Sequence, residues 1–245
     1  MSNLMERMNW MQIEEYLKTD DRIVLATGSV EQHGYNTVCT DTQCVWEIAK
    51  AACNKTGVLL APSVNYCYAG WATAFPGTVS ISATTTMALI KDILRSLVSQ
   101  GFKNILVLNG HGHWEYAANL AIEELAEEYP ELHAKFRSWY MLPKTYETIQ
   151  AEGCSWGCHA SFLESFPWIN QPEGVEIPDQ VKPAPNLQDY HTYGPKRHRE
   201  LFPDGMTGGA YKKDDEFMRK YFQGAVEQVV EILEGSWEKT PVYAE

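Results

Sequence analysis

Side chains capable of binding metal ions gather just after a short apolar run near the start of the sequence. Glu31 and His33 are two residues apart, and Asp41 follows across a loop. In extended chain, Glu31 and His33 project to the same side about 6–7 Å apart, a spacing that suits two metals about 3.5–4 Å apart. Asp41, with two oxygens, would bridge such a pair. The alternative is an exposed polar pair, with Asp41 capping the helix predicted at 43–53.

Two further stretches carry the same residue types. His111 stands in a glycine-flanked turn after the apolar run 104–108, and His113 follows two residues later. His111 could instead be satisfied by a backbone carbonyl, and His113 could face solvent from a first helical turn. His159 and Glu164 fall on a predicted short helix, where a separation of five residues turns them about 140° apart. They can serve one site only if His159 lies at the entrance of that helix.

The elements that must position these residues alternate between strand and helix. Strands are predicted at 22–27, 57–61 and 104–108, and helices at 43–53, 84–100, 114–129 and 214–234. This alternation of strands and helices predicts an α/β fold with a layered, mainly parallel sheet and helices on both of its faces. Ligand sites of such sheets lie beyond the carboxyl ends of the strands, where the first two stretches fall. Residues 1–245 are predicted to form a single domain, and 167–203 a long irregular connection that is functional or an interface.

Composition narrows the function classes. The 245 residues carry 20 Lys and Arg against 32 Asp and Glu, a net charge of −12, which argues against nucleic acid as a partner. No apolar run reaches the roughly 20 residues of a membrane span, and the first residues do not resemble a secretory signal. The six cysteines are therefore expected to be reduced thiols of a cytoplasmic protein. Neither a phosphate-binding glycine loop nor a G-x-S-x-G elbow beside Ser29 is present.

Four motifs in order resemble the creatininase (creatinine amidohydrolase) family. They are G-S-V-E-Q-H-G with T-D-T, F-P-G-T-V-S-I-S, G-F-K-N-I-L-V-L-N-G-H-G, and H-A-S-x-x-E-S, and they span roughly residues 20 to 166. The resemblance implies a layered α/β fold, one or two divalent metals per chain (Zn, Mn or Fe) and a homo-oligomer, often a hexamer.

The resemblance also implies roles for individual residues. Glu31, His33, Asp41 and His111 fall on the family's metal ligands, with Asp41 as the bridging carboxylate. His159 falls on the histidine that moves protons near the substrate. Glu164 falls on the neighbouring glutamate, which either orients that histidine or completes the metal shell.

Departures from the family pattern bear on the substrate. Creatininase has Glu where this chain has His113, and most other members have Gly. His113 is either a ligand, which would favour zinc or iron over manganese, or a residue of the substrate pocket. Tyr68, Trp71 and Trp156 could supply apolar walls for a small flat or cyclic substrate, although each could equally be core or interface packing. These changes predict a substrate other than creatinine.

The leading hypothesis is a metal-dependent amidohydrolase in which metal-activated water cleaves a C–N bond of a small cyclic or formyl amide. His159 would donate the proton to the leaving group, with Glu164 beside it. Two alternatives stay open. One is a related hydrolase that opens a cyclic ketone or lactone, such as an oxidised cyclitol, and the other is a non-catalytic protein that binds a metal or metabolite.

Overall fold

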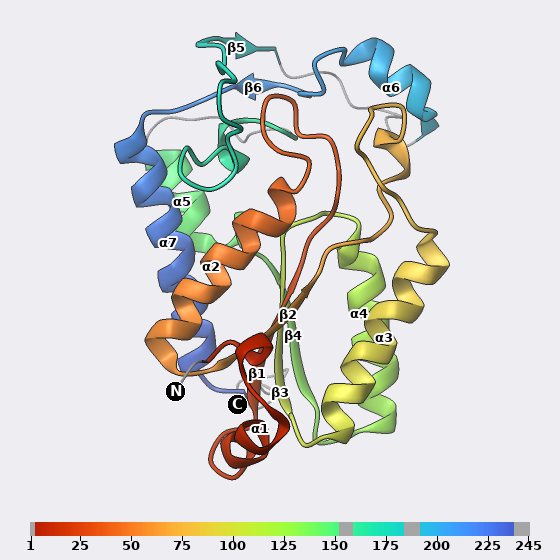
Figure 1. The fold of residues 1–245 in the computed structure, drawn as a ribbon, viewed down its shortest axis with the longest axis vertical. Coiled ribbons are helices and arrows are strands. Elements are labelled where there is room, and N and C mark those ends of the chain that lie inside the picture. Colours follow the sequence, from red (N-terminus) through yellow and green to blue (C-terminus); the bar gives the residue numbers. More distant parts are fainter. Residues whose placement is uncertain (1–2, 152–158, 184–191, 238–245) are drawn as a thin grey trace, which may run out of the picture.

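A computed structural model describes residues 3–151, 159–183 and 192–237 of the chain. The helices and strands, shown in Figure 1, are α1 (Trp10–Leu17), β1 (Arg22–Thr27), α2 (Thr40–Thr56), β2 (Leu59–Val64), α3 (Ala83–Ser99), β3 (Asn104–Asn109), α4 (Trp114–Glu128), β4 (His133–Ser138), α5 (Pro143–Ala151), β5 (Val181–Lys182), α6 (Pro195–Leu201), β6 (Gly209–Ala210) and α7 (Asp215–Glu234). Short 3-10 turns in the described ranges include η1 (Met5–Arg7), η2 (Gly70–Ala72), η3 (Trp139–Met141) and η4 (Phe162–Glu164).

A four-stranded parallel sheet organises the fold, with strand order β2-β1-β3-β4. The central strands β1 and β3 are buried on both faces, which explains their unbroken apolar sequences. Successive side chains of β1 point to opposite faces of the sheet. Ile23 and Leu25 join one apolar cluster, whereas Val24 and Ala26 join the other. The predicted α/β fold, with a mainly parallel sheet, is confirmed.

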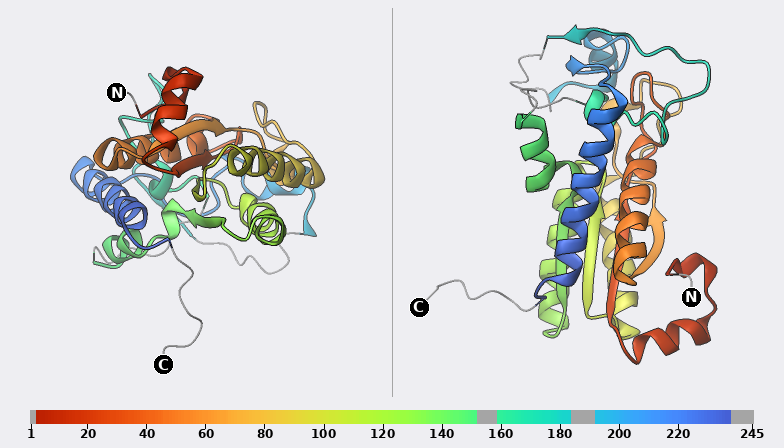
Figure 2. Two further views of the ribbon diagram at one scale, coloured as in Figure 1. Left: turned by 90° about the horizontal axis from the view of Figure 1, so that it is seen from below. Right: turned by 90° about the vertical axis from the view of Figure 1, so that its left-hand side faces the viewer.

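Helices cover both faces of this sheet (Figures 1 and 2). Helices α2, α5 and α7 pack together over one face, and α3 pairs with α4 over the other. Asp214 is the N-cap of helix α7, and its side chain accepts a hydrogen bond from the Phe217 N–H. Helix α3 is capped by Ser82 rather than by the threonines that follow it, and Gly101 just beyond its end adopts φ +108°. None of the helices in the described part of the chain is both long and apolar enough to span a membrane.

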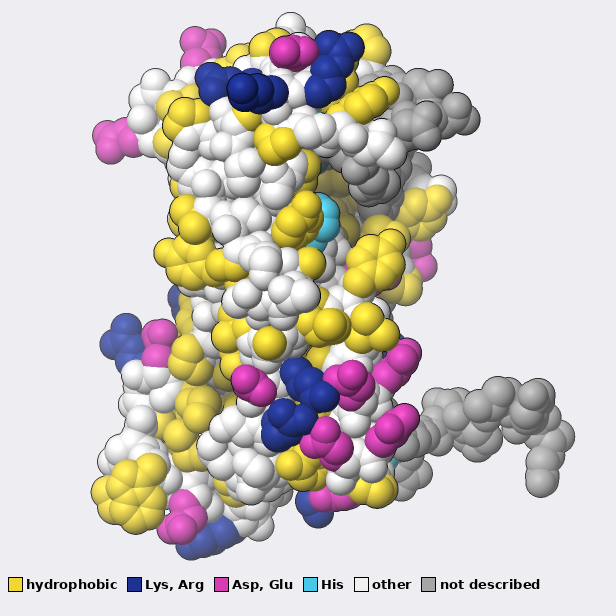
Figure 3. Space-filling model, turned by 90° about the vertical axis from the view of Figure 1, so that its right-hand side faces the viewer, with side chains coloured by type: hydrophobic (Ala, Val, Ile, Leu, Met, Phe, Trp, Pro, Cys, Tyr) yellow, Lys and Arg dark blue, Asp and Glu magenta, His cyan; other side chains and the backbone are white. Residues whose placement is uncertain are grey.

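The carboxyl ends of the four strands point toward a cap built from α6 and the two-stranded β5-β6 ribbon, at the top of Figure 1. The opposite end of the sheet carries α1. The face formed by α3 and α4 is shown in Figure 3, where charged side chains cluster on its lower half and hydrophobic ones lie above them. The charged cluster includes the ion pairs Lys91–Glu124 and Arg95–Glu128.

Some elements differ from the sequence-based predictions. The region 167–203 is not wholly irregular, because it contains β5 and the seven-residue helix α6. Helix α6 starts with Pro195 at its first position. Only His198 of its residues is buried, so no apolar periodicity marks it. Strand β4 and helices α1 and α5 were not predicted. Strand β4 is an edge strand that is mostly half-buried and therefore lacks a continuous apolar run.

Candidate metal centre

The candidate ligands come together at the carboxyl ends of β1 and β3. Glu31 and His33 lie in the loop that follows β1, Asp41 lies in the first turn of α2, and His111 lies in the turn between β3 and α4. Close backbone approach makes this possible. A Cβ on Gly110 would lie 2.3 Å from the Asp41 carbonyl oxygen, so the glycine allows the β3–α4 turn to pass directly over α2.

Asp41 does not cap helix α2. The helix begins at Thr40, with Cys39 at the N-cap and no side-chain cap hydrogen bond. The Asp41 carboxylate instead faces the site with both oxygens. Its Oδ1 lies 2.9 Å from His33 Nε2 and its Oδ2 lies 2.8 Å from His111 Nδ1. The buried Ser29 hydroxyl donates a 2.7 Å hydrogen bond to Oδ2. Ser29 is thus a hydrogen-bond partner of the Asp41 carboxylate.

Backbone carbonyls fix the orientation of both candidate histidine ligands. His33 Nδ1 donates to the Glu31 carbonyl oxygen at 3.0 Å, which leaves Nε2 facing Asp41. The His111 ring is turned the other way, because its Nε2 donates to the Tyr68 carbonyl oxygen at 3.1 Å while Nδ1 faces the carboxylates. Metal-binding histidines commonly donate their second ring N–H to a carbonyl in this manner.

Three groups of neighbouring donor atoms arise within the described residues. They are Glu31, Asp41 and His111; His33, Asp41 and Glu164; and Glu31, His33 and His159. In the first two groups Asp41 contributes to both. Ligand atoms on one ion at bond lengths of about 2.0–2.2 Å are separated by about 3–3.6 Å. The measured separations are compatible with this, at 3.1 Å between Glu31 Oε2 and His111 Nδ1 and 2.9 Å between Asp41 Oδ1 and His33 Nε2.

Two buried polar atoms at the centre of the site test whether these residues fit a metal ion. Glu31 Oε1 and His33 Nε2 are buried and have no hydrogen-bond partner. The Nε2 atom lies close to Asp41 but without the orientation of a hydrogen bond. Leaving such atoms unpaired is costly, and divalent cations bound beside Glu31 and His33 would satisfy both. The nitrogen and oxygen donors suit a divalent metal such as zinc, iron or manganese, so the residues present fit the metal that the sequence predicts.

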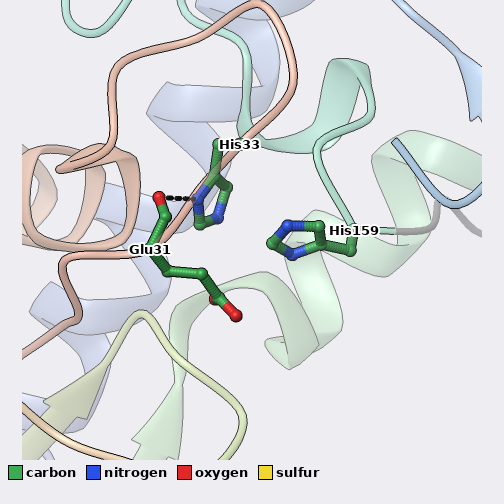
Figure 4. A group of neighbouring side chains, drawn as sticks. All are labelled: Glu31, His33 and His159. Atoms are coloured by element: carbon green, nitrogen blue, oxygen red, sulfur yellow. Dashed lines mark hydrogen bonds between the residues drawn. The ribbon is translucent and has the colours of Figure 1, made fainter. Parts of the chain in front are cut away.

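An unusual backbone conformation brings His159 and Glu164 to the same site. Ala160, between them, adopts φ +62°, the only positive φ of a non-glycine residue in the described part of the chain. Its N–H donates to Glu164 Oε2 at 2.8 Å. His159 precedes the short turn η4 that carries Glu164, so it lies at the entrance of that turn, as the sequence required. Figure 4 shows the His159 ring directed at the space between His33 and the Glu31 carboxylate.

The facing carboxylates and imidazoles of the site shift one another's pKa values. Burial alone would lower the pKa of His33, but the facing Asp41 raises it to about 10. Burial opposes the charged form of His111 as well, yet Glu31 holds its pKa well above the usual range. Burial would raise the pKa of Asp41, and the charges of His33 and His111 hold it well below. The same balance, with His111 as the main partner, lowers the pKa of Glu31.

His159 and Glu164 shift in the opposite directions. Burial, together with the nearby charge on His33, lowers the pKa of His159 to about 4. Burial raises the pKa of Glu164 to about 7. At neutral pH, His159 is therefore a neutral imidazole with a lone pair to offer, and Glu164 is partly protonated. Shifts of this size in a buried cluster are typical of functional sites.

His113 does not belong to any of the three donor groups. Its Nδ1 lies 3.2 Å from Nε2 of His111, on the side of that ring away from the carboxylates. Tyr68 contacts the His113 ring edge-on at 5.2 Å. Both residues line a mainly apolar pocket of about 350 Å³ between α3 and α4, with Met87 and Leu120 on its other walls. The geometry thus places His113 at a pocket wall and favours Glu164 over His113 as the further ligand candidate.

The remaining predicted pocket residues have different outcomes. Trp71 contacts the His159 ring edge-on at 4.8 Å and lies beside the site. Trp156 lies outside the described residues. Gln32 was not singled out from the sequence, although its side-chain nitrogen lies 3.0 Å from His159 Nε2. Its place between Glu31 and His33 in the E-Q-H-G motif was the available signal.

Comparisons of this chain with a family model, with curated proteins and with solved structures indicate the same family. The model of the family described as creatininase (creatinine amidohydrolase) matches residues 6–233. A 3-dehydro-scyllo-inosose hydrolase of Thermotoga maritima is 28% identical over 152 residues, 60% of this chain and 49% of the relative. A creatinine amidohydrolase of Pseudomonas putida is 28% identical over 111 residues, 42% of this chain and 43% of the relative. The chain thus spans about half the length of the curated relatives it matches.

Solved structures share the fold over nearly the whole chain. A structure described as "Creatininase Mn" superposes with a TM-score of 0.80 at 19% identity, covering 95% of this chain and 98% of the other. A creatininase variant described as "Zn-Zn type" gives a TM-score of 0.79 at 20% identity, covering 95% and 97%. With the family model extending from residue 6 to residue 233, the chain belongs to the creatininase (creatinine amidohydrolase) family.

Proposed function

We propose that this protein is a metal-dependent amidohydrolase that cleaves a C–N bond of a small cyclic or formyl amide other than creatinine. One observation carries the proposal. The two oxygens of Asp41 face two different imidazole nitrogens, at 2.9 Å and 2.8 Å, and each nitrogen has a further carboxylate beside it. Two donor groups that share one carboxylate are typical of hydrolases with two metal ions. Membership of the creatininase family supports the same reaction class.

The proposed cofactor is a pair of divalent cations. Glu31, Asp41 and His111 would hold one ion, and His33, Asp41 and Glu164 the other. Zinc, manganese and iron all suit this mixture of imidazole and carboxylate, and structural relatives described with Zn or Mn support the choice of class. When bound, such ions lower the pKa of water toward neutrality and polarise a substrate carbonyl.

The residues of this chain would do the rest of the chemistry. His159, neutral at physiological pH, would take a proton from the attacking water and give it to the leaving nitrogen as the C–N bond breaks. Glu164 lies beside it through Ala160 and accepts the N–H of that residue. Trp71, edge-on to His159, and Tyr68, at the wall next to His111, would line the substrate pocket together with His113. The assignment of Trp156 to this pocket rests on the sequence alone.

A second candidate is hydrolytic opening of a cyclic ketone or lactone. The relative from Thermotoga maritima, a 3-dehydro-scyllo-inosose hydrolase, favours it because 60% of this chain aligns with it. The same metals and the same His159 would serve, because negative charge again develops on a carbonyl oxygen while a bond beside it breaks.

A substrate panel tests the proposal. Zinc- or manganese-loaded protein is assayed with cyclic amides, formyl amides, lactones and oxidised cyclitols, and Asp41→Ala is compared with the surface variant Asp92→Ala. The first candidate is supported if the wild type hydrolyses an amide, Asp41→Ala does not, and the free energy of unfolding of that variant equals that of the wild type. Turnover of lactones or cyclitols alone supports the second. A loaded protein that turns over none of the panel contradicts both.

Assembly and location remain predictions. A homo-oligomer, hexameric by resemblance to the family, would be measured by sedimentation velocity. A cytoplasmic location would be checked by fractionating the producing cells.

A further inference from the structure

Gln32 is buried between two segments that are distant in sequence. Its side-chain Nε2 donates to the Gly205 carbonyl oxygen at 2.9 Å and lies 3.0 Å from His159 Nε2. Its Oε1 accepts the Gly34 N–H at 3.0 Å. Gly34 offers only a donor and Gly205 only an acceptor, so these two backbone groups fix which end of the amide is nitrogen. The amide therefore presents an N–H, not an oxygen, to His159.

The backbone of Gln32 approaches the same histidine nitrogen. Its carbonyl oxygen lies 2.8 Å from His159 Nε2. One ring nitrogen thus faces a donor and an acceptor from one residue. Whichever neutral tautomer His159 adopts, Nε2 has a hydrogen-bond partner and the ring keeps the same orientation. In this orientation the ring points at the space between His33 and Glu31 (Figure 4).

Gly205 makes room for this arrangement. A Cβ on Gly205 would lie 1.8 Å from Gln32 Oε1 and 2.8 Å from its Cδ, so any other residue would displace the amide. The backbone around it is anchored. Lys182 Nζ donates to Asp204 Oδ1 and to the Met206 carbonyl oxygen, at 2.5 Å and 2.7 Å. The Thr207 N–H donates to the carbonyl oxygen of His159 itself. The segment 204–207 therefore holds both Gln32 and His159.

We propose that Gln32 is a positioning residue for His159 and is itself fixed by the backbone of Gly34 and Gly205. The segment 204–207, between α6 and β6, thereby sets the orientation of the proton-transferring histidine. The proposal rests on the proposed function for the role of His159. Its geometric content, the orientation of that ring, does not depend on any substrate. Residues that orient a functional histidine without touching substrate commonly change activity by about 10–100-fold when replaced.

A pair of glycine variants separates this role from backbone strain. Gly205 has φ +82° and Gly174 has φ +77°, but nothing lies within 4 Å of a Cβ on Gly174. Both Gly205→Ala and Gly174→Ala therefore suffer a similar backbone penalty, and only the first displaces Gln32. In Gly205→Ala we expect kcat/KM to fall about 10–100-fold with zinc content unchanged, whereas Gly174→Ala stays close to the wild type. Gln32→Met should resemble Gly205→Ala, and the double variant should be no worse than the more impaired single one.

Nitrogen NMR of the histidine rings in zinc-loaded protein supplies a measurement independent of turnover. The signals of His159, assigned by their loss in His159→Asn, should move in Gly205→Ala and Gln32→Met and stay in place in Gly174→Ala. Unmoved His159 signals in the first two variants overturn the proposal, even if activity falls. Moved signals in a protein that hydrolyses nothing on the substrate panel would leave the positioning role intact and refute the proposed function instead.

Discussion

Metal binding should release protons, because the metal-free site stores them on the histidines that would become ligands. His33 has a pKa of about 10 and that of His111 is also well above the usual range. Only an unprotonated ring nitrogen binds a metal. At pH 7.5 each histidine therefore loses about one proton when its ion binds. Glu164, with a pKa of about 7, is about one quarter protonated at that pH and loses this fraction as well.

The effect of proton competition on metal binding at His33 can be calculated. A pKa of about 10 lies about 2.5 units above pH 7.5, so protons weaken the apparent affinity at His33 about 300-fold, or about 3 kcal/mol. The sign follows from the raised pKa. Protonation favours the metal-free state at every pH below about 10, so the affinity rises with pH, by about tenfold per unit for each ion. Acid releases the metal.

Isothermal titration calorimetry with zinc checks this directly. The observed enthalpy in buffers of different ionisation enthalpy gives the number of protons released. At pH 7.5 the two histidines should release about two protons for two ions, Glu164 a small further fraction, and a water ionised by the ions up to one more. The variant His33→Gln should bind one ion and release at least one proton fewer. His133→Gln, the same change at the start of β4 and far from the ligands, should leave both numbers unchanged.

Two results would refute this reasoning. Zinc binding without proton release at pH 7.5 would mean that the histidines are neutral before the metal arrives. An affinity that is constant between pH 6.5 and 8.5 would have the same meaning. Either result contradicts the close pairing of His33 and His111 with the carboxylates.

The remaining predictions concern single side chains. Glu31→Gln and Glu164→Gln each remove a carboxylate from only one of the two proposed ion sites, whereas Asp41 contributes to both. Elemental analysis should therefore find about one zinc lost in each of the first two variants and both lost in Asp41→Asn; equal loss in all three would contradict two separate sites. Gly110→Ala places a Cβ 2.3 Å from the Asp41 carbonyl oxygen, whereas on Gly112 the nearest atom is 3.8 Å away. Urea unfolding should show Gly110→Ala destabilised by about 1–3 kcal/mol or more and Gly112→Ala close to the wild type; equal stability would argue against the close approach of β3–α4 to α2.

All three strands that the sequence predicted, at 22–27, 57–61 and 104–108, are present in the sheet, the second as the edge strand β2, whose first three residues are buried. Residues 22–27 and 104–108 are continuous apolar runs because helices cover them from both sides, and both are central strands of the sheet. Strand β4, at the other edge of the sheet, was not predicted because its apolar and charged residues alternate. Ala134 and Phe136 pack inward while Lys135 and Arg137 alternate with them, so its apolar content is too low for a continuous run.

The chemistry of the site was also largely visible in the sequence. The residue types at Glu31, His33, Asp41 and His111 identify nitrogen and oxygen donors, and their position after predicted strands identifies the edge of the sheet where they meet. Local sequence carries this information because side-chain chemistry and strand periodicity are both local properties.

Only the tertiary structure decided how these groups face one another. Whether Asp41 caps α2 or bridges two histidines depends on where the helix begins and on the Ser29 hydroxyl. The side of His111 on which His113 lies, and the left-handed Ala160 that turns His159 and Glu164 to one site, are equally invisible in the chain. These features arise where segments far apart in sequence pack within a few ångströms, and a spacing along the chain does not specify such distances or ring orientations.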